Sequence, residues 1–502
     1  MIIVGSAVKK PLPVNQRKSS TSESLFGIDP RSLAVFRMAI GTLLLVDLAV
    51  RAGDLSVMYT DDGMFSRAEI CRRATTIWNW SFHFGGGSWG YQAMLFGLAA
   101  ALAIALVVGF ETRLAVIGSW VMLVSLHHRV PPILSGAENL HRMLLFWAMF
   151  LPLARVWSVD AWLEKRRGLT GTQNRLAPVL SVASAAILLQ MALMYLFSAI
   201  AKSNSDWLRG EAMAGILVHD FFASPSSAYV LQLPGLLKWA TWGTFALEWA
   251  APLLLFCPIG TARVRMVLIA VLAVMHISIG IFLEVGLFSY VSLAGLTLFL
   301  PSAFWNSPAL ARFSKIAEQG SRIAYPRPRP SYLAQGLCLT LFIYVLAINI
   351  NNLPSRPLAP LAPERWRPMT RGVGLTQSWG MFGEIPSRDG WHVAKAKLHD
   401  GSEVDLLRNG AAVDWNKPGF PATMYPNYFW QKIFREMAYD DEQGFQLMRA
   451  PVAQFLCRDW NGRNTPQKQI VEFEFIYCMQ NKAESASQIQ RERLLHLDLG
   501  DS

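Results

Sequence analysis

Lys202 ends an apolar segment and shares one face of the predicted helix with two other polar side chains. It follows eleven residues that carry no charge, and Tyr195, Ser198 and Lys202 are separated by three and four residues, the spacing of neighbours on one helix face. A lysine at the edge of a bilayer either extends its ammonium group to water and anchors the helix, or lies desolvated as a neutral amine that can act as a base. Anchoring is the usual role at a helix end, and the sequence leaves both open.

Four further ionisable residues lie within or beside apolar segments. Glu248 is near the middle of one segment, His276 is in the outer half of another, Asp47 is near the outer end of the first, and His141 begins a fourth. Ionisable side chains are costly inside a bilayer and therefore mark candidate functional sites. Glu248 and His276 can equally serve helix packing, and a lone histidine such as His141 can cap a helix or bond a loop carbonyl.

The composition is that of a polytopic membrane protein. Of the 502 residues, 52% are hydrophobic and only 16% are charged, and the chain carries 18 Trp and 28 Phe. The net charge of +11 therefore indicates basic cytoplasmic loops rather than a nucleic-acid partner. The five cysteines lack metal-ligand spacing, so no metal is expected. Cys457 and Cys478 could form a disulfide if the C-terminal part is extracytoplasmic.

Nine apolar segments predict an all-α membrane domain of about nine transmembrane helices. Most have the roughly 20 residues that a helix needs to cross a bilayer, although the third and fourth are short. The segments are 33–50, 91–109, 114–126, 143–154, 178–201, 239–257, 266–283, 285–301 and 333–350.

The basic residues predict the orientation of this domain. With the N-terminus inside, the cytoplasmic segments carry roughly twice as many Lys and Arg residues as the opposite loops. Nine spans then place the C-terminus outside. Lys202 and His141 would lie at the same, extracytoplasmic face of the membrane.

A small α+β domain is predicted to follow the last span. Asp400-Gly401 is a hairpin signal between two predicted strands, and Tyr428–Ala438 has the pattern of an amphipathic helix. Phe455–Trp460 and Ile470–Cys478 are predicted strands, with a turn at Asn461-Gly462. The predicted division is a cytoplasmic tail over 1–30, a membrane domain over 31–351, a proline-rich linker over 352–363, an extracytoplasmic α+β domain over 364–482 and a polar tail over 483–502.

Four stretches of the chain match a known family. They are AENLHRMLLFWAMFLPLARVWSVDAW, YLFSAIAKSNSDWLRGEAM, HISIGIFLEVGLFSYVSLAGLTLF, and QSWGMFGEIP followed by GWHVAKAKLHDG. Together they resemble the vitamin K-dependent gamma-carboxylase family, in its bacterial branch with the horizontally transferred transmembrane (HTTM) domain. The helix that ends on Lys202, followed by Asp206, Trp207 and Gly210, is the most specific part of a resemblance that covers about residues 25–400.

The carboxylase branch of this family uses reduced vitamin K, oxygen and carbon dioxide to carboxylate protein glutamate. The resemblance implies that Lys202 is the base that deprotonates the hydroquinone and that His141 assists the carbanion step. A lysine has a reference pKa of about 10.4, so such a base must be desolvated. The implied substrate or quinol pocket contains Tyr195, Ser198, Asp206, Trp207, Glu248 and His276.

The resemblance also implies a cofactor and partners. Reduced vitamin K or menaquinol, with oxygen and carbon dioxide, is the expected cofactor set, and membrane lipid and a peptide or protein substrate are the expected partners. Two features depart from the carboxylase branch: Ala201 stands where that branch has a second lysine, and the outer region is reduced to about 140 residues.

Two functions follow as hypotheses from these features. The first is a quinol-dependent, carboxylase-like enzyme of the plasma membrane (the bacterial inner membrane) that acts at its extracytoplasmic face. The second is a non-enzymatic membrane scaffold, immunity or export-accessory protein that binds a partner through its outer domain.

Overall fold

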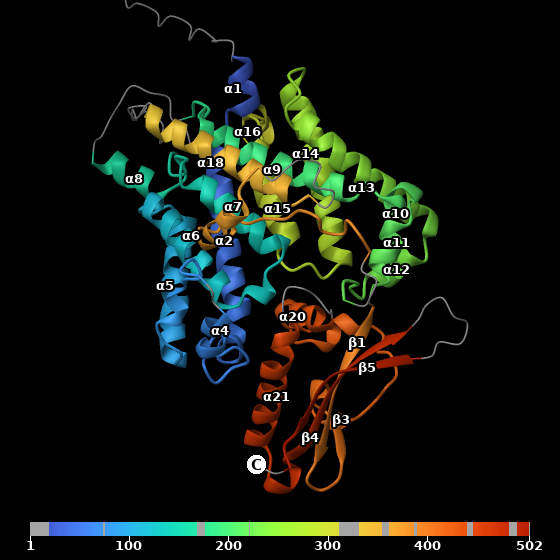
Figure 1. Ribbon diagram of the computed structural model, residues 1–502. Helices are drawn as coiled ribbons and strands as arrows, with labels where there is room; N and C mark the ends of the chain where they lie inside the picture. The colour runs from blue at the N-terminus through green and yellow to red at the C-terminus, as the bar shows by residue number, and fades with distance from the viewer. Residues whose placement is uncertain are drawn as a thin grey trace, which may run out of the picture.

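The computed structural model is a helical body followed by a smaller domain that contains a sheet (Figure 1). The predicted tail over 1–30 lies mostly outside the described residues. Within its described part, residues 21–26 form helix α1 (Thr21–Phe26). Most of the predicted linker over 352–363 also lies outside them. The structure describes residues 20–73, 76–167, 176–219, 221–310, 331–353, 361–385, 389–438, 445–480 and 489–500.

Helices occupy all nine apolar segments, but they differ in length. Five of them, within the described residues, are long and apolar enough to cross a membrane: α2, α5, α9, α14 and α18. Helices α7 and α15 have only 13 and 9 residues. The structure therefore supports a polytopic membrane domain without confirming nine spans. The helices are α2 (Pro30–Gly53), α5 (Trp89–Val108), α6 (Thr112–Arg129), α7 (Gly136–Ala148), α9 (Val182–Ala201), α13 (Pro234–Leu255), α14 (Thr261–Phe282), α15 (Phe288–Leu296) and α18 (Tyr332–Asn351).

Helix α9 is the central helix of the membrane domain. Of its most apolar window, 67% is buried, against 22% for both α14 and α18, which present apolar side chains to their surroundings. It begins with a capping box in which Ser181 and Ser184 exchange hydrogen bonds. Because α9 packs against α7, α13 and α18, its C-terminal end meets several other elements.

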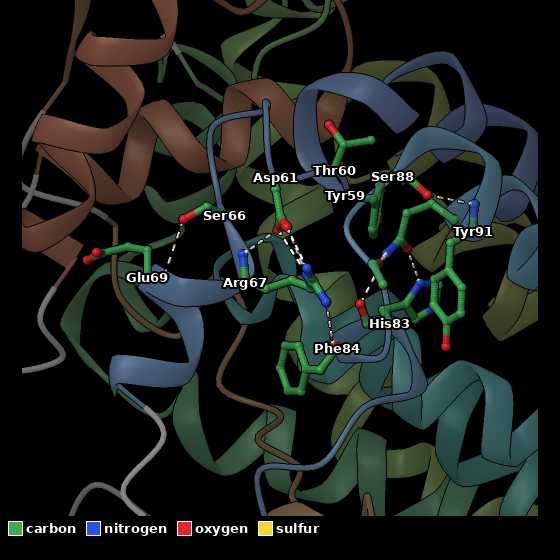
Figure 2. Close-up of polar contacts among 12 residues, drawn as sticks. Tyr59, Thr60, Asp61, Ser66, Arg67, Glu69, His83, Phe84, Ser88 and Tyr91 are labelled. Carbon is green, nitrogen blue, oxygen red and sulfur yellow. Dashed lines mark hydrogen bonds and ion pairs between the residues drawn. The ribbon is translucent and has the colours of Figure 1, made fainter.

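The connection between α2 and α5 is held by polar contacts. The Arg67 guanidinium forms an ion pair of 2.8 Å with Asp61 and donates a hydrogen bond to the Phe84 carbonyl, as Figure 2 shows. His83 Nδ1 lies 2.6 Å from Gln92 Oε1, which ties the same connection to the start of α5. This ordered connection lies at the end of the membrane domain that faces the C-terminal domain (Figure 1).

The C-terminal domain is built on a five-stranded antiparallel sheet in the order β3-β2-β1-β4-β5. The predicted hairpin is confirmed, and Gly401 in its turn has a φ of 84°, which favours glycine. The predicted helix is confirmed as α20 (Tyr428–Ala438). The strands are β1 (Gly390–Leu398), β2 (Glu403–Asp405), β3 (Ala411–Ala412), β4 (Ile470–Gln480) and β5 (Ile489–Asp498).

Two predictions for this domain are wrong. Residues 455–460 and the predicted turn at Asn461-Gly462 belong to helix α21 (Arg449–Arg463), whose buried residues include Val452 and Leu456, four residues apart on one helix face. Residues 489–498 are not a polar tail: they form β5, which pairs with β4 over almost its full length. The polar composition of β5 fits a strand at the sheet edge, where charged side chains are tolerated.

The possible disulfide between Cys457 and Cys478 is not formed in this structure, where both cysteines are free and buried. Cys457 packs with Phe473 and Phe475 on the side of the sheet that α20 and α21 cover. Cys478 packs with Trp391 on the opposite face. Successive side chains of a strand point to opposite faces, so the sheet itself separates the two thiols.

Helix α20 joins the two domains. Asp54, at the end of α2, accepts hydrogen bonds from Trp430 Nε1 at 3.0 Å and from Asn427. The Arg51 guanidinium lies 4.2 Å from the centre of the Phe429 ring. Apolar side chains of both domains form one buried cluster here. The C-terminal domain therefore packs directly against the membrane domain.

Candidate functional site

Lys202 is buried at the end of α9, with 4% of its surface exposed. Its Nζ donates hydrogen bonds to Ser198 Oγ and to Glu248 Oε1, the latter at 3.1 Å. It also lies 5.2 Å from the centre of the Trp207 ring. Lys202 therefore does not extend to bulk water as an anchor would; its Nζ is buried beside a carboxylate.

Glu248 comes from α13 and keeps one oxygen without a hydrogen bond. Its Oε2 lies 3.1 Å from Lys202 Nζ, within ion-pair distance, but only Oε1 accepts a hydrogen bond, and Oε2 is buried without one. Pro252 lies within α13 four residues later, and because proline lacks an N–H, the Glu248 carbonyl has no helical partner there. The backbone hydrogen bond that is missing from α13 is therefore the one that the Glu248 carbonyl would accept.

Tyr195 and His276 form a second polar pair beside the first. The Tyr195 hydroxyl lies 2.8 Å from His276 Nε2, and both side chains are almost fully buried. His276 Nδ1 has no hydrogen-bond partner. The site thus contains two unpartnered polar atoms, one on each pair, and both atoms can accept or share a proton.

Both pairs line one pocket, in which the empty space amounts to about 630 Å³ with open solvent included. Six of the eight predicted site residues line it: Tyr195, Ser198, Lys202, Trp207, Glu248 and His276. The rest of its wall is mostly apolar and aromatic, and includes Met194, Met275, Ile279, Leu283, Phe288 and Trp379.

A segment after the last span covers this cavity. Ser378, Trp379, Met381 and Phe382 contribute to its wall, and the Phe382 carbonyl accepts a hydrogen bond of 2.9 Å from Trp207 Nε1. Phe382 has a φ of 56°, the left-handed conformation that non-glycine residues adopt at a cost. Sequence reasoning identified this segment only through the family resemblance and did not predict its contact with α9.

The position of Ala201 is explained by the same segment. A Cβ at Gly383 would lie 3.0 Å from the Ala201 carbonyl oxygen and 3.1 Å from its Cβ. Residue 201 therefore packs closely against the covering segment. A long side chain in place of Ala201 would displace that segment.

His141 and Asp206 are not among the residues that line the cavity. His141 lies within α7, with Nε2 3.3 Å from the Ile40 carbonyl of α2; only Gly136, at the start of α7, reaches the cavity. Asp206 instead pairs with Arg209 at 2.9 Å in the short helix α10 (Ser205–Arg209). The predicted membrane depth of His141 did not specify which face of α7 carries it.

Gly210 of the same motif has a conformational role. It ends α10 with a φ of 79°, and a Cβ there would lie 2.7 Å from Cγ of Lys238 and 3.1 Å from the Trp242 ring. Only glycine adopts this conformation without strain or steric conflict. The motif thereby turns the chain after Trp207 and holds that ring over Lys202.

The described residues contain one group with metal-ligand spacing, Glu472, Glu474 and His496. It lies on the sheet, away from the cavity, and Glu474 pairs with Arg493 at 3.1 Å. The Lys202 cavity itself offers one carboxylate and one imidazole beside an amine, a set suited to proton transfer.

Comparison with known proteins places the chain in a family. The model of the HTTM domain matches residues 27–305, which include α9 and the helices that carry Glu248 and His276. No solved structure matches the chain. Since the match covers more than half of its length, the chain belongs to the HTTM domain family.

Proposed function

We propose that this protein is a quinol-dependent enzyme related to the vitamin K-dependent carboxylases, and that its quinol binds in the Lys202 cavity. The observation that carries the proposal is the burial of Lys202 with Glu248 in a mostly apolar cavity, where Glu248 Oε2 and His276 Nδ1 lack hydrogen bonds. Unpartnered polar atoms are costly when buried, so a polar ligand that reaches them would be stabilised.

The residues present fit a reduced quinone. Its two hydroxyl groups match Glu248 Oε2, which accepts as a carboxylate and donates once protonated, and His276 Nδ1, which can donate or accept according to its tautomer. Trp379 and Phe288 provide aromatic surface for its ring, and Met194 and Ile279 provide apolar surface for its tail. When bound, the reduced quinone would supply, with oxygen, the driving force for carboxylation.

Lys202 and Glu248 would hold and move the proton. In a dry cavity a charged pair is costly unless its hydrogen bonds are complete, and Glu248 Oε2 has none. When the ligand is bound, transfer of the Lys202 proton to that oxygen would leave a neutral amine and a neutral acid, which lowers the cost of keeping the pair away from water. The neutral amine is then the base for the hydroxyl proton of the ligand.

Access from the bilayer follows from the position of the cavity. Helices α13 and α14 contribute wall residues such as Thr244 and Met275, and their outer faces expose Leu253 and Ile277. A lipid-soluble ligand would reach the cavity between these two helices. The proposed location is a plasma membrane, such as the bacterial inner membrane, with the N-terminus cytoplasmic and the C-terminal domain outside.

His141 has no part in this proposal. Its nearest described polar partner is a backbone carbonyl of α2, so it does not reach the reacting atoms in this conformation. We assign to this chain's cavity only the proton transfer by Lys202 and Glu248, assisted by Tyr195 and His276.

A photoreactive menaquinone analogue tests the binding step. In the purified protein it should cross-link to peptides of α13, α14 or 378–383, and menaquinol should compete. Thr244→Trp fills the cavity from α13 and should abolish the cross-link. Thr340→Trp makes the same change on an exposed face of α18 and should not. Equal cross-linking in both variants would remove the cavity as the quinol site and favour the scaffold hypothesis.

A further inference from the structure

We propose that the C-terminal domain contains a second ligand site, which recognises a carboxamide group. The site is a pocket between the sheet and the segments that follow β2 and β3. It shares no residue with the Lys202 cavity, so it does not depend on the proposed quinol chemistry. Its wall includes Trp391, Val393, Asp405, Leu407, Arg408 and Met424.

Strand register places the key residues on the free face of the sheet. Trp391 and Val393 of β1 alternate with His392 and Ala394, and the latter two face the side covered by α20 and α21. Asp405 of β2 is opposite Lys395, which has the same parity as Trp391 and Val393. All three cavity residues therefore lie on the face that the helices leave open.

Asp405 presents one unused acceptor. It is fully buried, and its Oδ1 accepts backbone hydrogen bonds from Ala394 at 3.1 Å and Leu407 at 3.0 Å. Its Oδ2 has no partner. Arg408, a cation of the cavity wall, pairs with Asp414 at 3.0 Å instead. Burial raises the pKa of Asp405 above its ordinary value, as expected for a carboxyl group without a full set of donors.

Trp391 presents one unused donor. Its side chain is 1% exposed and its Nε1–H has no acceptor. A buried indole N–H normally finds a partner. The residues that line the cavity therefore include one unsatisfied acceptor and one unsatisfied donor. Apart from water, a single ligand satisfies both atoms only if it carries a donor and an acceptor of its own.

A carboxamide meets this requirement with separate donor and acceptor atoms, whereas a hydroxyl group must serve both from one oxygen. Its NH₂ donates and its carbonyl accepts, whereas a carboxylate only accepts and an ammonium only donates. Val393, Leu407 and Met424 give the cavity apolar surface against which the methylene groups of a glutamine-like ligand would pack. The ligand is either a free small molecule or an Asn or Gln side chain of another protein.

Saturation-transfer difference NMR on the full-length protein in detergent tests the site. The probes are free L-glutamine and N-acetylglutamine methylamide, which separate the two sources, with the glutamate and lysine analogues of the second probe as controls. At least one glutamine probe should give a signal several times that of either control analogue. No signal from both glutamine probes, or equal signals from the controls, would overturn the proposal.

Two variants locate the signal. In Asp405→Asn, Oδ1 still accepts the two backbone hydrogen bonds, so the new NH₂ must occupy the Oδ2 position and replace an acceptor by a donor. Trp391→Phe removes the N–H and keeps a ring. Each should reduce the glutamine signal at least fivefold. The matched control Asp400→Asn alters an exposed turn whose Oδ1 also accepts a backbone hydrogen bond and should change nothing. A full signal in either cavity variant would contradict the assignment.

Discussion

The sequence predicts several neighbours of Lys202, but its partner Glu248 is identified only by the structure. Intramembrane charge is costly, and this cost alone identified Glu248 and His276 as site candidates. Helical spacing placed Tyr195 and Ser198 beside Lys202. The pairing of Lys202 with Glu248, 46 residues later in the chain, could not be predicted, because it depends on how α9 and α13 pack. His141 does not line the cavity for a similar reason: its predicted depth in the membrane does not define the face of the helix that carries it.

The Lys202–Glu248 pair should behave as a coupled unit in stability measurements. Lys202→Met leaves a buried carboxylate without its partner and should destabilise the protein by about 3–5 kcal/mol. Adding Glu248→Gln should recover much of that loss, because the charge is then gone. Thermal unfolding in detergent, analysed as a double-mutant cycle, measures the coupling. Lys238→Met, an exposed lysine beside Trp242, is the control; additive effects of the two cavity substitutions would contradict the pairing.

His392 should make the protein sensitive to acid. Burial, and secondarily Arg449, lowers the pKa of His392 from 6.5 to about 3. Between these values the unfolded chain binds a proton that the folded protein does not, so stability is full above pH 6.5 and declines as the pH falls toward 3. From pH 7.5 to 5.0 the decline should be about 2 kcal/mol. His392→Phe, in a pocket already lined by Phe475 and Phe434, should flatten it.

The measurement for His392 is the midpoint of thermal unfolding at pH 7.5 and 5.0. His399→Phe replaces an exposed histidine of the same domain and should leave the acid dependence as in the unmodified protein. If His392→Phe and the unmodified protein lose the same stability over this range, the buried neutral state of His392 is wrong.

At the scale of elements, strong local signals were predicted well and long-range contacts were not. The Asp400-Gly401 turn and the apolar face of α20 are encoded within a few residues, and both predictions are confirmed. Helix α21 was taken for a strand over a short window, where apolar periodicity is ambiguous. The segment over 376–385 covers the cavity by folding back onto α9, and a contact of that kind leaves no periodic signal in either segment.

Gly383→Ala should loosen the cover of the cavity. The added methyl group would lie 3.0 Å from the Ala201 carbonyl oxygen, so the covering segment must move away from α9. Amide hydrogen exchange should increase at residues 199–204 and 378–383. Gly419→Ala, where nothing lies within 4 Å of the new methyl group, serves as the control and should exchange normally. Unchanged exchange in Gly383→Ala would show that the segment does not pack as described.

At the scale of the whole molecule, the two ends of the chain lie at opposite ends of the structure. Helix α1 is at one end of the membrane domain, and the docked C-terminal domain is at the other (Figure 1). This arrangement supports an N-terminus and a C-terminal domain on opposite sides of the membrane. The excess of basic residues in alternate loops predicts that orientation, whereas the number of spans cannot be counted from hydropathy because α7 and α15 are short.

Reporter fusions test this arrangement. Alkaline phosphatase fused after Ser502 should be active, and a fluorescent protein that folds only in the cytoplasm should be dark at the same position. The reverse pattern would place the C-terminal domain inside and overturn the proposed orientation of the cavity. The full-length chain is used in both fusions because α20 is docked on the membrane domain.

The central claim is that Lys202 is a buried base for a quinol-dependent carboxylation. Its most direct test is incorporation of labelled bicarbonate into a glutamyl peptide by the purified protein with menaquinol and oxygen. The unmodified protein and Lys238→Ala should incorporate label. Lys202→Ala and Lys202→Arg should lose at least 99% of it, since arginine cannot be deprotonated in a protein. A fully active Lys202→Ala variant, or no label from the unmodified protein with any of several peptides, would contradict the account.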